Sequence, residues 1–121
     1  MATARDLRRI ALSLEGTTEA PHFDRAAFKV ARIYATLAAD GRTANFKFTP
    51  DEQELKCLML PEAFTRIPNA WGSQGWTTGT LSEMTAADLR SALETAWRHA
   101  QGKPRGKARA SKSPAAKAKG R

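Results

Sequence analysis

The sequence predicts a single α+β domain that combines an antiparallel sheet with amphipathic helices. Apolar and polar residues alternate through most of residues 26–48, and this stretch contains Asp40-Gly41, a strong hairpin signal. The segments 3–14 and 85–100 instead repeat apolar residues at helical spacing. A chain of 121 residues, 41% of them hydrophobic, has room for one such domain with a modest core.

The first helix is expected over residues 3–14. Thr3 and Asp6 form a variant of the capping box at its start. Gly16 follows the last apolar position and can adopt the left-handed conformation that ends a helix. The apolar stripe of this helix consists of Leu7, Ile10, Ala11 and Leu14.

A three-stranded meander is expected next, with strands at 26–30, 33–38 and 43–48. The preceding residues 17–25 form a loop or a short edge strand, because Pro21 is unsuited to a central strand. One face of the meander is apolar, with Phe28, Val30, Ile33, Ala35, Leu37, Ala44, Phe46 and Phe48. The other face is largely polar and carries Lys29, Tyr34, Thr36, Thr43, Asn45 and Lys47.

Thr49-Pro50-Asp51-Glu52 is a strong helix start, with an N-cap Thr, a Pro at the first position and a Glu that completes the capping box. This second helix is expected to end near Leu58, with Leu55, Leu58 and Met59 on one side. Pro61 stops or bends it. Residues 62–65 are expected to add one further turn.

Residues 67–81 predict a glycine-dependent bend at Trp71-Gly72 that leads into a short strand over 75–81. Trp71 and Trp76 fit a core position and a ligand contact about equally well, since neighbouring glycines also permit close approach of a ligand. The last helix begins at Thr85, which pairs with Asp88 as a cap. Its buried stripe comprises Leu89, Leu93, Ala96, Trp97 and Ala100.

The positive charge is confined to the end of the chain. Residues 1–101 contain 12 Lys or Arg and 12 Asp or Glu, so the net charge of +8 comes entirely from residues 102–121. That segment has no acid and no large apolar side chain, so we expect a disordered tail after a domain spanning 1–101. Such a tail predicts sequence-independent contact with phosphates, of DNA more than of RNA, through Lys103, Arg105, Lys107, Arg109, Lys112, Lys117, Lys119 and Arg121. The alternative is a tail that only aids solubility or that binds acidic membranes.

The outer sheet face is a second candidate contact surface for nucleic acid. Cations beside an aromatic ring can hold a single strand by charge and stacking, and this face offers Lys29, Arg32, Tyr34 and Lys47. A merely solvated face is the simpler interpretation. A different class of function is also open: the body binds a small molecule or a protein through Trp71 and Trp76, and the tail only localises it.

Sequence patterns of enzymes and metal sites are absent. There is no glycine-rich phosphate loop, no His-Glu-x-x-His and no Gly-x-Ser-x-Gly, and Cys57 is the single cysteine. We therefore expect a monomeric, non-enzymatic protein without metal or cofactor. A pocket lined by Glu19, His22 and Tyr34 would reopen the question of catalysis. The lack of a signal-peptide pattern and of a long apolar run predicts a cytoplasmic protein, nucleoid association included, without membrane contact.

The order of several short motifs resembles the MmcQ/YjbR family over residues 3–100. These motifs are Leu-Glu-Gly-Thr-Thr-Glu after the first helix, Phe-Lys-Val, Ile-Tyr-Ala-Thr-Leu, Phe-Lys-Phe followed by Pro-Asp-Glu-Gln, Pro-Glu-Ala-Phe, Trp-Gly-Ser-Gln-Gly-Trp-Thr, and Thr-Ala-Ala-Asp-Leu. The resemblance implies a two-layer sandwich similar to the frataxin-like (CyaY-like) fold, with helices on one face of the sheet, and a DNA-binding role. It does not extend to frataxin-like iron binding, because the first helix has Arg5, Arg8 and Arg9 against one acid, Asp6.

Overall fold

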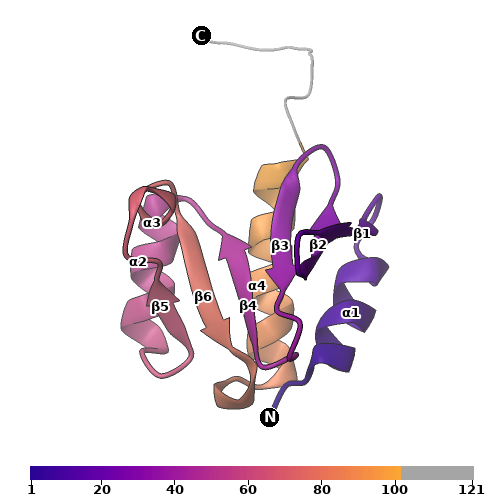
Figure 1. Ribbon diagram of the computed structural model, residues 1–121. Coiled ribbons are helices and arrows are strands. Elements are labelled where there is room, and N and C mark those ends of the chain that lie inside the picture. The colour runs from indigo at the N-terminus through magenta and orange to yellow at the C-terminus, as the bar shows by residue number, and fades with distance from the viewer. Residues whose placement is uncertain (102–121) are drawn as a thin grey trace, which may run out of the picture.

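Six strands form one antiparallel sheet in the order β1-β2-β3-β4-β6-β5, and the three long helices lie on the same face of it (Figure 1). The structure, a computed structural model, describes residues 1–101. The two-layer α+β fold that the sequence and the family resemblance predict is confirmed. The predicted tail, 102–121, lies outside the described residues.

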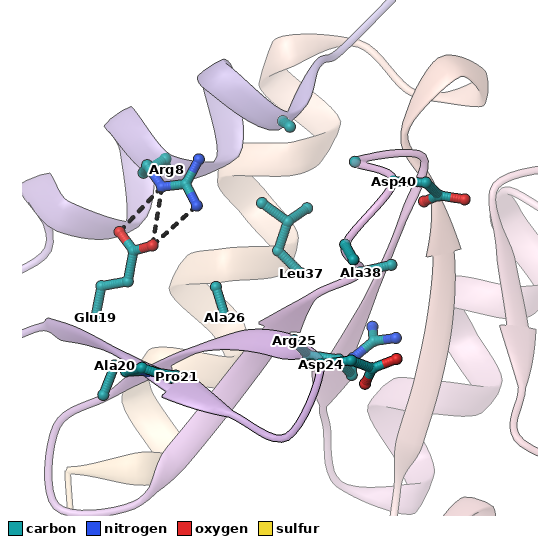
Figure 2. Close-up of a pocket in the computed structure, with 13 residues that line it drawn as sticks. Arg8, Glu19, Ala20, Pro21, Asp24, Arg25, Ala26, Leu37, Ala38 and Asp40 are labelled. Carbon is teal, nitrogen blue, oxygen red and sulfur yellow. Dashed lines mark hydrogen bonds and ion pairs between the residues drawn. The ribbon is translucent and has the colours of Figure 1, made fainter.

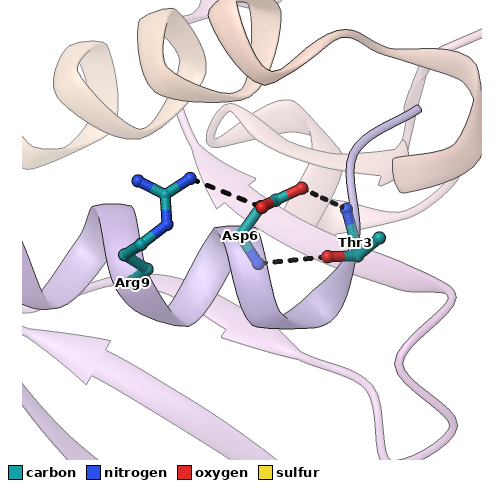
Figure 3. A network of polar contacts seen from close by, with 3 residues as sticks. All are labelled: Thr3, Asp6 and Arg9. Atoms are coloured by element: carbon teal, nitrogen blue, oxygen red, sulfur yellow. Dashed lines mark hydrogen bonds and ion pairs between the residues drawn. The ribbon is translucent and has the colours of Figure 1, made fainter.

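Each long helix begins with a complete capping box. The helices are α1 (Ala4–Ser13), α2 (Pro50–Met59) and α4 (Ala86–Ala100), and the predicted caps are all present. Figure 3 shows the first: the Asp6 amide donates to Thr3 Oγ1 over 3.2 Å, and the Thr3 amide donates to Asp6 Oδ2 over 3.1 Å. Arg9 also pairs with Asp6, at 3.4 Å. A cap of this kind typically stabilises a helix by about 1 kcal/mol.

The first four strands form the predicted meander with an additional edge strand. They are β1 (Thr18–His22), β2 (Arg25–Lys29), β3 (Ile33–Leu37) and β4 (Thr43–Lys47). β1 contains the proline and lies at the end of the sheet, as a proline-containing strand should. The turn predicted at Asp40-Gly41 is present, with Gly41 at a φ of 74°.

A β-bulge between β2 and β3 changes which side chains face the helices. Phe28 pairs with Ala35 and Lys29 with Ile33, so Tyr34 is the additional residue. The predicted outward position of Tyr34 is wrong: its side chain is fully buried, and its hydroxyl lies 2.9 Å from Thr17 Oγ1. By the same shift Ile33, predicted to face inward, joins the open face of the sheet.

The second half of the chain completes the sheet. The turn expected at 62–65 is present only in its first half, as a turn over 61–63; the rest is β5 (Phe64–Arg66), a strand paired with β6 (Trp76–Thr80). The predicted bend is a short helix, α3 (Ala70–Ser73), and the left-handed residue that follows is Gly75, with a φ of 107°. A Cβ at Gly75 would lie 1.8 Å from the carbonyl oxygen of Phe48, so only glycine fits there.

Helix α2 turns an amide towards the core, not its leucines. Gln53 is buried, and its Nε2 lies within hydrogen-bond distance of Gly72 O (2.9 Å), Trp76 O (3.0 Å) and Thr77 Oγ1 (3.1 Å). Leu55, Leu58 and Met59 do lie on one side of α2, but that side is exposed. These contacts tie α2 to α3 and β6, because the N–H groups of a buried amide must find acceptors.

The core lies between the helices and one face of the sheet. Phe46 stacks on Phe48 with centroids 5.9 Å apart, and Phe64 meets both edge-on. Trp97 of α4 is half-buried against this core and donates its indole N–H to Glu15 O over 3.0 Å. Within residues 1–101, no helix is long and apolar enough to cross a membrane.

Candidate binding cleft on the open sheet face

The face of the sheet that no long helix covers carries cations and no carboxylate on its strands. Residues that pair across antiparallel strands share a face, and Thr36, Asn45 and Thr78 form one such row across β3, β4 and β6. Strand alternation from this row adds Arg25, Lys29 and Lys47 to the same face. None of the described strands places Asp or Glu there.

A cleft of about 530 Å³ opens on this face. Trp71 of α3 contributes to its wall and is 59% exposed, and Phe23 of the β1–β2 turn is 94% exposed. Trp76 of β6, half-buried, also lines the cleft. The structure thus places both tryptophans at the open face instead of in the core. The remaining lining residues are His22, Asp24, Arg25, Ile33, Thr36, Asn45 and Ile67.

Phe23 occupies a backbone position that normally belongs to glycine. His22 pairs with Arg25, so Phe23 and Asp24 form a two-residue hairpin loop. Phe23 has a φ of 60°, and it is the only described non-glycine residue with a positive φ. A positive φ at the first loop residue alone is the pattern of a type II′ turn, which prefers glycine at that place. The sequence did not indicate this, because Phe-Asp is not a recognised turn pair.

The floor of the cleft is ordered by two side-chain hydrogen bonds. Arg25 Nε donates to Thr36 Oγ1 over 2.9 Å, and Thr78 Oγ1 donates to Asn45 Oδ1 over the same distance. The Asn45 amide nitrogen makes no hydrogen bond to any residue of the described range, so its N–H groups remain for a ligand. The floor is therefore a set of donors between aromatic walls.

The cations predicted on the outer face are found near one end of the sheet. Lys29 and Lys47 lie on the open face, and Arg32 is exposed in the turn between β2 and β3. The Arg32 amide donates to Ala100 O over 3.2 Å, which brings this turn to the end of α4. Arg32 therefore lies beside the last turn of α4; the eight cations predicted in 102–121 lie outside the described residues. Tyr34, predicted as part of this surface, is buried and contacts α1 instead.

A second cavity of about 580 Å³ lies between α1 and the ends of β2 and β3 (Figure 2). Arg8 of α1 holds Glu19 of β1 at its edge, with Nε 3.0 Å from each carboxylate oxygen. Glu19 thus forms an ion pair with Arg8, whereas His22 lines the sheet-face cleft and Tyr34 is buried in the core. The structure does not bring these three residues together in one pocket.

Cys57 and the histidines show no arrangement typical of a reactive site. Burial raises the pKa of the Cys57 thiol, although a hydrogen bond from the Arg66 backbone opposes the shift, so the reactive thiolate is disfavoured. His99, on α4, lies 2.7 Å from Glu52, whereas His22 lines the sheet-face cleft. Among residues 1–101, no three His, Cys, Asp or Glu side chains are grouped so that they could hold a metal ion.

Comparison with known proteins gives a family and a similar structure. The family model YjbR matches residues 12–99. A crystal structure of the Deinococcus radiodurans protein DR2400, with the domain DUF419, superposes with a TM-score of 0.67 at 24% sequence identity, over 79% of this chain and 76% of that one. This likeness concerns the fold. No curated protein matches the chain.

Proposed function

The chain belongs to the YjbR family, and on this premise we propose that it binds nucleic acid, chiefly DNA, through the phosphate backbone and without regard to sequence. The observation that carries the proposal is the one-sided charge of the molecule. The open sheet face has Arg25, Lys29 and Lys47 and no strand carboxylate, and eight further cations follow the end of α4 in the sequence.

The neutral charge of residues 1–101 does not conflict with this proposal, because many of the acids are engaged away from the open face. Asp6, Glu52 and Asp88 close capping boxes at the helix starts. Glu19 pairs with Arg8 of α1. The cations of the open face therefore have few carboxylates near them, and a phosphate chain could replace solvent and counterions there.

We also propose that the protein acts without catalysis, as a monomer, in the cytoplasm where DNA is found. The raised pKa of Cys57 supports the first point, as does the separation of Glu19, His22 and Tyr34.

Salt-dependent binding of duplex DNA tests the proposal. For the full chain, the eight tail cations should contribute about −7 to the slope of log K against log salt, and Lys29 with Lys47 about −2, for a total of about −9 at about 0.9 per neutralised phosphate. Replacing the eight tail cations with Gln should remove most of the affinity and of the slope. Lys29→Gln with Lys47→Gln should reduce the slope by about 2 more units. Lys56→Gln, on the helix layer where Lys56 Nζ bonds Ser91 Oγ, is the matched control and should change neither. Duplex binding that is unaffected by the tail replacement would contradict the proposal.

The cleft supports a second candidate function, the binding of a small molecule or a protein segment. Its volume of about 530 Å³ is within the usual range of ligand pockets, roughly 300–1,000 Å³. In that case the tail only localises the protein. The two functions differ in salt response, since a neutral ligand in the cleft would bind equally well when the tail cations are replaced.

A further inference from the structure

We propose that the cleft holds an unpaired base of single-stranded nucleic acid, so that the protein prefers single strands to duplexes. This inference rests on the proposed function and assigns the site within it. The aromatic walls carry it: Phe23 and Trp71 are both strongly exposed and line one cleft. They approach the cleft from opposite edges of the sheet, since β1 and β2 lie at one edge and α3 precedes β6 near the other.

Exposed aromatic walls suit a planar ligand. Every base has a π face, and stacking on an aromatic side chain makes a substantial and sequence-tolerant contribution to single-strand binding. A base inside a duplex has both faces covered by its neighbours and cannot offer one to Phe23 or Trp71. The cleft thus distinguishes single strands from duplexes by geometry alone.

The unfavourable backbone conformation of Phe23 supports a ligand-binding role for its side chain. A bulky residue at positive φ is unfavourable, and Gly, Asn or Asp would suit the turn better. Burial does not compensate for it, because the ring is 94% exposed and its one aromatic neighbour is His22, 4.8 Å away. Backbone strain without a structural return is typical of binding sites.

Charge and hydrogen-bond donors favour a nucleic acid over a peptide. The strands around the cleft contribute Arg25, Lys29 and Lys47, and Asp24 is the one acid among the lining residues. The Asn45 side-chain oxygen accepts from Thr78, and this contact orients the amide. Its nitrogen can then donate to the carbonyl oxygens of a base. A base that enters between the aromatic walls would find donors below it and cations beside its phosphates.

The test compares two single strands of equal length, oligo-dT and an abasic strand, which carry the same phosphates but differ in their bases. Full-length protein is titrated with each at moderate salt and followed by anisotropy. Phe23→Ala and Trp71→Ala should each weaken oligo-dT binding about tenfold or more and leave abasic binding unchanged. Phe23→Trp, which keeps an aromatic ring, should retain the affinity for oligo-dT. Leu12→Ala, an exposed apolar position on α1, is the matched control.

The outcomes separate this inference from the proposed function. If the aromatic variants bind oligo-dT as well as the parent chain, while the tail replacement abolishes DNA binding, the base site is wrong and the proposed function stands. Equal losses on oligo-dT and on the abasic strand would also overturn the base site. If the parent chain binds neither strand nor duplex, both are overturned. Circular dichroism melting checks that Phe23→Ala keeps the fold. Its melting temperature should match that of the parent chain, because an exposed ring contributes little to stability.

Discussion

The two faces of the same sheet use the same strands for opposite purposes. On the covered face, Phe28, Phe46 and Phe48 are almost completely buried beneath the helix layer, in which α4 packs on β3 and β4. On the open face, the residues between them along the chain, such as Asn45 and Lys47, remain accessible, and Phe23 and Trp71 project beside them. An aromatic residue in this fold therefore has one of two distinct roles. Inside it stabilises the domain; outside it is available to a ligand.

The largest effect should come from breaking the covered face. Phe46→Ala removes a ring that packs on Phe48 and Phe64, and the cavity it leaves should lower the free energy of unfolding by about 3–5 kcal/mol. Urea denaturation followed by circular dichroism measures this loss. A loss below 1 kcal/mol would mean that the covered face is not the main source of stability.

The next largest effect on stability should come from Gln53, which links α2 to α3 and β6. Gln53→Ala removes the buried donor to Gly72 O and Trp76 O, which should cost about 1–3 kcal/mol because the hydrogen bonds that tie α2 to α3 and β6 are lost. The same change should loosen α3 and therefore Trp71, so tryptophan fluorescence should shift as well. Gln74→Ala, an exposed amide in the same segment, is the control and should alter neither stability nor fluorescence. If Gln53→Ala matches this control, α3 is held by other contacts.

Local signals predicted the covered face well, and the open face less so. The capping boxes at Thr3, Thr49 and Thr85 could be predicted because each depends on residues three positions apart. The alternation of β4 predicted the burial of Phe46 and Phe48 for the same reason. Both features depend only on residues that are close together in the sequence.

Three features of the fold depend on residues distant in sequence and could not be predicted in this way. The bulge that buries Tyr34 is defined by the register of β2 against β3. The burial of Gln53 depends on where the carbonyls of residues 72 and 76 lie. The cleft brings Phe23 together with Trp71, which is 48 positions later in the sequence. The glycines beside the tryptophans mark those two residues as candidates, whereas no local pattern marks Phe23, an aromatic residue in a type II′ turn.

A smaller effect should appear when the protein is acidified. Partial burial by itself raises the pKa of Glu52, but hydrogen bonds from the Thr49 amide and the His99 ring outweigh it, so the pKa lies below its usual value of 4.5. A carboxyl with a lowered pKa in the folded state stabilises the protein above pH 4.5, and this contribution is lost as the pH falls through the folded-state pKa.

The expected loss is below about 1 kcal/mol, because the Glu52 side chain is 32% exposed and solvent screens the pair. Urea denaturation between pH 7 and pH 3 measures it. Glu52→Gln keeps a capping side chain but no titrating group, so its stability should depend less on pH in this range. The pair joins α2 to α4, so acid should weaken the helix layer. The open sheet face has no strand carboxylate to respond. An identical pH dependence in Glu52→Gln would assign the acid response to other carboxyls.

The smallest stability effect should come from the counterpart of Phe46 on the open side. Phe23→Ala removes the same ring from a fully exposed position, and the free energy of unfolding should change by no more than about 0.5 kcal/mol. Phe23→Gly should be slightly more stable than Phe23→Ala, since glycine adopts the positive φ of this turn without steric cost. The measurement is the urea midpoint of the two variants beside Phe46→Ala. If Phe23→Ala instead cost several kcal/mol, the ring would be a structural element of the hairpin. The open face would then also stabilise the domain, and Phe23 would not distinguish a binding face from a stabilising face.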